Sequence, residues 1–124
     1  MVCATITRDP VQVDDELTVQ IRDGLHEAIV KEFRVKPKQV EMRVREVGPL
    51  DINSGPLAID IDSGPGVDSW RIEECPKLIL RITSFLIANG IVPKEFWPEG
   101  KSNIWIRIYA KGASMPIGRA DLRH

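Results

Sequence analysis

The sequence predicts an α+β fold in which two β-α-β units form a four-stranded mixed sheet with two helices on one face. Four stretches alternate apolar and polar residues as strands do, and two longer stretches carry apolar residues at helical spacing. These stretches follow one another as β-α-β, β-α-β. The 124 residues suit one domain, 1–124, with a first unit at about 2–47, a second at about 57–110 and a tail at 111–124.

The first unit contains one amphipathic helix between two strands. Its predicted segments are a strand at 2–8, a helix at 14–33, a turn at 34–39 and a strand at 40–47. The helix places Leu17, Ile21, Leu25, Ile29 and Phe33 on one stripe. An aspartate, Asp14 or Asp15, can cap its first turn.

The second unit repeats this pattern after a Gly/Pro-rich loop at 48–56. Its predicted segments are a strand at 57–62, a turn at 63–66, a helix from about 68–74 to 89, a loop or short turn of helix at 92–100, and a strand at 103–110. Asn89 and Gly90 form a good helix C-cap. Pro76 belongs near the first turn of the helix or marks a kink.

The predicted sheet has one apolar and one polar face. The apolar face, which the helices would cover, holds Val40, Met42, Val44, Leu57, Ile59, Ile61, Ile104, Ile106 and Ile108. The opposite face holds Glu41, Arg43, Arg45, Asp60, Asp62, Trp105, Arg107 and Tyr109. Trp105 and Tyr109 are large to leave in water. A subunit interface in a closed oligomer would cover such a face, and a solvated face is the simpler alternative.

Composition narrows the classes of partner. The chain has 17 basic and 18 acidic residues, so it has no excess of positive charge that would favour nucleic-acid binding. It also has no run of apolar residues long enough to span a bilayer. Cys3 and Cys75 form neither a disulfide framework nor a metal-ligand spacing. We therefore expect a cytoplasmic protein with no metal, no cofactor, and no nucleic-acid or membrane partner.

The chain resembles the tautomerase superfamily, the group of macrophage migration inhibitory factor, 4-oxalocrotonate tautomerase and malonate semialdehyde decarboxylase. The resemblance covers roughly residues 2–110. It rests on the duplicated β-α-β order, on "VCATITR" followed by a long helix, on "VKPKQVEMRV", which is similar to a Lys-Pro-Pro-Gln turn into a strand, and on a strand, the turn "DSGPG" and a second helix. It implies a homotrimer whose polar sheet faces point inward.

The resemblance also implies a chemistry. Members of the family use an N-terminal proline, exposed by removal of Met, as a general base or a cationic acid. Its amine suits this role because an α-amine has a pKa of about 7.7–8.0. The matching residue here is Val2, so the chain lacks the catalytic proline. With Met1 in place the Val2 nitrogen is an amide and cannot act as a base.

Other positions carry over from the family one at a time. Lys36 resembles a substrate-binding lysine, and Trp105 and Arg107 fall where the family places pocket residues between subunits. An arginine there would hold a carboxylate bidentately. Asp62 and Ser63 lie on the turn that offers backbone groups to the ligand. Solvation of Lys36, pairing of Arg107 with an aspartate and simple packing of Trp105 are the structural alternatives.

Three functions remain open. The first is a keto-enol tautomerase or related lyase that acts on a small 2-keto or unsaturated carboxylate, with the Val2 amine, if free, moving the proton. The second is a trimer that keeps an anion pocket without catalysis, which the loss of the proline favours. The third is a structural or partner-binding subunit that docks through the loop at 46–56 and the tail.

Overall fold

The computed structural model describes residues 1–48, 50, 55–64, 69–90, 104–110 and 115–122. The predicted loop at 92–100 and most of the one at 48–56 lie outside this part of the chain. The elements are β1 (Val2–Arg8), α1 (Asp15–Phe33), the short 3-10 helix η1 (Pro37–Gln39), β2 (Val40–Glu46), β3 (Leu57–Asp62), α2 (Ser69–Ala88), β4 (Ile104–Tyr109) and β5 (Pro116–Leu122).

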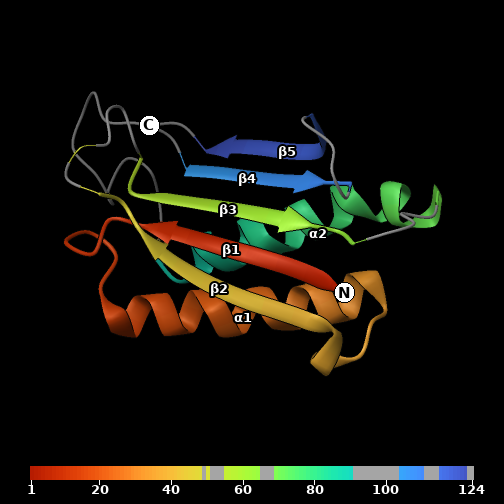
Figure 1. Cartoon of the computed structure of the whole chain (residues 1–124), viewed down its shortest axis with the longest axis horizontal. Coiled ribbons are helices and arrows are strands. Elements are labelled where there is room, and N and C mark those ends of the chain that lie inside the picture. The colour runs from red at the N-terminus through yellow and green to blue at the C-terminus, as the bar shows by residue number, and fades with distance from the viewer. Residues whose placement is uncertain (49, 51–54, 65–68, 91–103, 111–114, 123–124) are drawn as a thin grey trace.

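The described strands form one mixed sheet in the order β2-β1-β3-β4-β5. Within each unit the two strands are parallel and a helix connects them: β1 with β2 through α1, and β3 with β4 through α2. The two units join where β1 and β3 run antiparallel. Figure 1 shows the sheet in front and both helices behind it. The predicted α+β class and the duplicated order are thus confirmed.

The sheet has five strands, and the prediction of four was wrong. Residues 116–122, which were expected to belong to a tail, form β5 and pair antiparallel with β4. Pro116 is tolerated because it is the first residue of an edge strand. Gly118 allows close packing, since a Cβ there would lie 3.0 Å from the Cβ of Cys75 on α2.

The helix boundaries follow the capping residues. Asp14 is the N-cap of α1, and its Oδ1 accepts a hydrogen bond of 2.8 Å from the Leu17 N–H. Helix α1 ends at Phe33, and its C-cap residue, Arg34, adopts a left-handed conformation with φ 53°. Pro76 lies inside α2, where it removes one helical hydrogen bond. Of the two predicted alternatives, a place near the first turn was wrong, because the helix already begins at Ser69; a kink at Pro76 stays a prediction.

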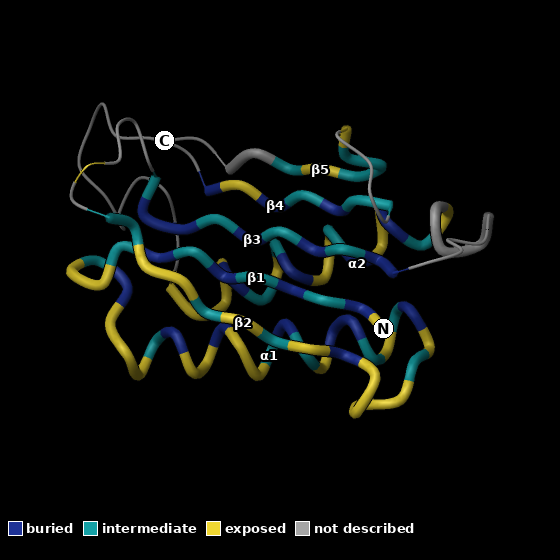
Figure 2. The backbone as a smooth tube through the Cα atoms, in the orientation of Figure 1, coloured by how far each residue is buried: buried dark blue, intermediate teal, exposed yellow. Residues whose placement is uncertain are grey.

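The core lies between the sheet and the helices. In Figure 2, buried positions alternate with half-buried or exposed ones along the strands and along α1. The strand residues predicted for this face are buried or half-buried. Ile59, Ile61, Ile104, Ile106 and Ile108 are completely buried, with Leu25, Ile29 and Phe33 from α1 and Leu78, Ile82 and Leu86 from α2. Their burial is the main source of stability, and it leaves the opposite sheet face for the polar residues.

Candidate functional site

The open face, by which we mean the sheet face opposite the helices, is organised in rows across the strands. Strand register fixes which residues lie side by side. One row is Glu41, Cys3, Asp62 and Tyr109; the next is Arg43, Thr5, Asp60, Arg107 and Arg119; a third is Arg45, Thr7, Ala58, Trp105 and Asp121. The middle row sets one carboxylate among three guanidinium groups.

Met1, the residue before β1, lies against the turn that follows β3. Val2 pairs with Val40 and points its side chain toward the helices, where it is only 2% exposed. A Cβ added at Gly64 would lie 2.7 Å from the carbonyl oxygen of Met1, and Gly64 has φ +87°, which favours glycine. The backbone at the start of the chain therefore lies against the turn at 62–64.

The two predicted binding residues of this turn have different surroundings. The Asp62 side chain is half-buried, and its Oδ1 accepts a hydrogen bond of 2.9 Å from the Gly64 N–H. Ser63 is completely buried, and its hydroxyl donates to the carbonyl oxygen of Tyr109 at 2.7 Å. Ser63 thus ties the ends of β3 and β4 together, and ligand contact by either residue stays a prediction.

Lys36 lies at the same end of the sheet as Val2. It is exposed and immediately precedes η1, which leads into Val40, the β2 partner of Val2. Both backbone polar groups of Lys36 are hydrogen-bonded to Gln39: the Lys36 N–H donates to Gln39 Oε1, and the Lys36 carbonyl accepts from the Gln39 N–H, each at 2.9 Å. His26 Nε2 lies 2.9 Å from the Pro37 carbonyl oxygen and links α1 to this turn.

Trp105 and Arg107 form a separate group. The Arg107 guanidinium carbon lies 3.8 Å from the centroid of the Trp105 ring, a cation–π contact. In the strand register, Arg107 lies level with Thr5, and Trp105 lies level with Thr7. Thr7 is five residues along β1 from Val2, so at about 3.3 Å per residue Trp105 lies about 16 Å along the sheet from Val2. Within one chain, therefore, the structure brings Val2, Lys36, Asp62 and Ser63 to one end and leaves Trp105 and Arg107 farther along.

A shallow hollow of about 500 Å³ lies on the open face between these two groups. It is lined by Cys3, Thr5, Arg43, Asp60, Asp62, Tyr109 and Ala110. Burial raises the pKa of Asp60, and the charge of Arg107 partly opposes this. Arg43 donates to Glu41 at 2.9 Å and lowers its pKa. Strand parity had placed Asp60 and Tyr109 on this face, but only the strand order makes them neighbours of Cys3 and Arg43.

The part of the chain described by the structure brings together no three His, Cys, Asp or Glu side chains that could hold a metal ion. Neither of its two long helices combines the length and apolar character needed to cross a membrane. Neither Cys3 nor Cys75 forms a disulfide.

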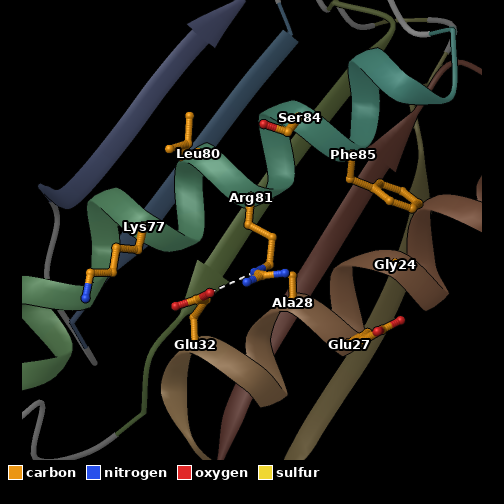
Figure 3. A pocket seen from close by; sticks show the side chains of 9 residues that line it. All are labelled: Gly24, Glu27, Ala28, Glu32, Lys77, Leu80, Arg81, Ser84 and Phe85. Carbon is orange, nitrogen blue, oxygen red and sulfur yellow. Dashed lines mark hydrogen bonds and ion pairs between the residues drawn. The ribbon is translucent and has the colours of Figure 1, made fainter.

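A larger hollow, of about 620 Å³, lies on the other side of the molecule between α1 and α2. Figure 3 shows its lining, with Phe85 directed toward Gly24 and Arg81 reaching Glu32 across the groove. The Arg81 Nε–Glu32 Oε1 distance is 2.7 Å. This groove contains none of the residues predicted for a site.

The fold is shared with solved structures of known class. The match to the MIF2 protein of Leishmania major covers 94% of this chain and 96% of the MIF2 chain, with 14% sequence identity and a TM-score of 0.57. A fused 4-OT described as an asymmetric trimer matches 90% and 85% at 15% identity (TM-score 0.55). N1, a member of the cis-3-chloroacrylic acid dehalogenase family, matches 87% and 73% at 11% identity (TM-score 0.54).

These likenesses show that the chain has the tautomerase fold, as the sequence resemblance implied. No family model matches the sequence, and no curated protein does. The fold is thus established by structure, while activity has to be argued from the residues at the site.

Proposed function

We propose that this protein is a tautomerase-superfamily member that interconverts the keto and enol forms of a small 2-keto or unsaturated carboxylate. The general base in this proposal is the α-amine of Val2, released by removal of Met1. The supporting observation is the position of the Met1 carbonyl carbon, to which the Val2 nitrogen is bonded. It would lie 3.3 Å from a Cβ at Gly64, so a Val2 amine freed from Met1 would lie beside the turn at 62–64, next to the open face. The tautomerase fold supports the same reading.

The proposed reaction needs one base and one anion-binding group. The uncharged amine removes a proton from the carbon beside the keto group, and the resulting ammonium gives this proton to the carbonyl oxygen. The amine is thereby regenerated, and no proton is consumed overall. The amine is suited to this because its ordinary pKa is about 7.7–8.0, near neutral pH. Lys36 and Arg107 would bind the carboxylate of the substrate.

A homotrimer is part of the proposal. In one chain Arg107 and Trp105 lie away from Val2, so a second copy would have to supply them to the pocket. On the open face of the single chain, the large side chain of Trp105 is 37% exposed and Asp60 is half-buried. An exposed aromatic residue of this kind is expected on a surface that a neighbouring subunit covers. A fused 4-OT of this fold is described as a trimer. We place the trimer in the cytoplasm, because reduced cysteines that form no disulfide, such as Cys3 and Cys75, are typical of that compartment.

Two alternatives remain. The non-catalytic trimer is favoured by Val2, which replaces the ring nitrogen of proline with a primary amine or, if Met1 stays, an amide. In that case the same anion pocket would bind without turnover. The structure gives less support to docking of a structural partner, because half of the expected tail forms β5 within the chain.

The enol-to-keto conversion of an arylpyruvate, followed by ultraviolet absorbance, tests the proposal. We expect turnover that is lost when the α-amine is chemically blocked, and a kcat/KM reduced about tenfold or more in Lys36→Ala, the loss expected when a hydrogen bond to a charged group disappears. Lys38→Ala, which removes an exposed lysine of η1, is the matched control. Carboxylate binding without turnover across a panel of keto acids would establish the non-catalytic alternative instead.

A further inference from the structure

Strand β5 places a second arginine beside Arg107. Arg107 and Arg119 are directly opposite each other in the antiparallel β4–β5 pair, so their side chains leave the sheet on the same face. The neighbouring residue fixes which face this is. A Cβ at Gly118 would meet Cys75 and Ile79 of α2, so Gly118 points toward the helices and Arg119 toward the open face. Arg119 is exposed there.

Two like charges directly opposite on neighbouring strands destabilise a sheet. The acids that are described on the open face offset this repulsion only in part. Glu41 pairs with Arg43 on the far edge strand, and Asp62 Oδ1 accepts from the Gly64 N–H. Asp60, level with Arg107 in the same row, carries a single half-buried carboxyl group. The side chain of Asp121 lies outside the described part, so its contribution has to be measured.

The Arg107 guanidinium is also held in place before any ligand arrives. Its carbon lies 3.8 Å from the centroid of the Trp105 ring, which restricts the side chain and leaves the N–H groups at the edge of the guanidinium plane able to donate. Opposite residues of an antiparallel pair have Cα atoms about 4.5–5.5 Å apart. The two arginine side chains therefore leave the sheet from neighbouring positions on the open face.

We propose that Arg107 and Arg119 together form an anion-binding subsite that holds one carboxylate of a small ligand, with one oxygen on each guanidinium. The choice of a carboxylate rests on the proposed function. Binding itself requires no turnover, so this subsite can be tested whether or not the protein is a tautomerase.

Calorimetric titration of the full chain with pyruvate and with malonate tests the subsite. We expect Arg119→Gln and Arg107→Gln each to weaken binding at least tenfold, and Arg119→Lys to weaken it less, since the charge stays and only the paired geometry is lost. Arg45→Gln is the matched control, because Arg45 is an exposed arginine of the same face that lies outside the proposed subsite; its Nη1 donates to the Val44 carbonyl. It should change the affinity less than twofold. Asp121→Asn should leave affinity equal or higher.

Repulsion between the two arginines gives a second measurement on the same variants. Without ligand and at low salt, Arg119→Gln should melt at a temperature equal to or higher than the parent, while malonate should raise the melting temperature of the parent more than that of the variant. The subsite is refuted if Arg119→Gln binds both acids as the parent does. It is also refuted if that variant changes the mass in sedimentation while the parent binds neither acid, because Arg119 would then pair with a second copy.

Discussion

Arg8 shows at the scale of a single residue how polar groups hold this fold together. It ends β1 with a side chain that is 9% exposed, and its Nη1 donates to the Val13 carbonyl and to Thr18 Oγ1. Its Nη2 lies 2.6 Å from Asp15 and 3.0 Å from Glu46. One guanidinium thus joins the end of β1, the start of α1 and the end of β2.

Replacing this arginine tests its role. Arg8→Met should lower the midpoint of thermal unfolding by several degrees, because Val13 and Thr18 lose their donor and two carboxylates lose their cation. Arg22→Met removes only an exposed pair with Asp23 and should change the midpoint little. Equal midpoints for the two variants, measured by circular dichroism, would show that the Arg8 contacts contribute nothing.

Asp60 gives a pH-dependent prediction at the same scale. Burial raises its pKa above the ordinary 3.8, so the folded state takes up this proton more readily than the unfolded state. The stabilising effect is present at low pH and is lost as the pH rises through the folded pKa. At pH 7 the ionised group is therefore unfavourable, and Asp60→Asn should raise the denaturant midpoint, with the gain shrinking as the pH falls toward 4.

A matched variant separates this effect from a general effect of removing charge. Asp62→Asn weakens the acceptor for the Gly64 N–H and should lower the midpoint at pH 7. If Asp60→Asn were the less stable of the two at neutral pH, Asp60 would be making a favourable interaction, and the burial argument would be wrong.

At the scale of elements, the contact between α1 and α2 depends on Gly24. A Cβ at this position would lie 2.1 Å from Cζ of Phe85, so the glycine makes room for the aromatic ring (Figure 3). A glycine inside a helix otherwise costs about 1 kcal/mol relative to alanine. The sequence alone shows this cost, and the packed structure shows the reason for it.

A double-mutant cycle in urea tests this packing. Gly24→Ala alone should leave the free energy of unfolding unchanged or lower it, because the ring of Phe85 has to move. In a Phe85→Ala background the same change should raise it by about 0.5–1 kcal/mol, as helix propensity predicts. The same stabilisation in both backgrounds would mean that Phe85 does not occupy the space above Gly24.

Element prediction succeeded where periodicity was strong. The strands at 2–8 and 57–62 and both long helices follow from alternation or from helical spacing, since burial of one face imposes the pattern. Strand β5 was missed because Pro116 and Gly118 interrupt its apolar pattern. It is fixed instead by the free edge of β4 and by the close approach of α2, which local sequence does not encode.

The site was predictable in composition but not in arrangement. Strand parity placed Asp60, Asp62, Trp105 and Arg107 on one face, which the structure confirms. Parity gives no strand order, so the separation of Trp105 from Val2 and the position of Arg119 opposite Arg107 could not be read from sequence. The hydrogen bond from Arg8 to Glu46, 38 residues away, likewise could not be read from the local sequence.

At the scale of the whole molecule, assembly decides whether the separated groups can meet. Sedimentation equilibrium should give a mass three times that of the 13.9 kDa chain. Charge reversal on the open face, as in Arg43→Glu, should reduce this mass, because it places like charges in a covered interface. A monomeric mass at working concentrations would mean that Trp105 and Arg107 cannot complete a pocket at Val2.

The most direct test of the proposed base compares two chains that differ only at the start. One retains Met1, and the other begins at Val2 with a free α-amine. We predict that both are folded trimers, and that only the chain beginning at Val2 converts the enol of an arylpyruvate to its keto form, with a rate that falls as the pH drops below the pKa of the amine. Equal turnover in both chains, or none in either, would contradict a catalytic role for the Val2 amine.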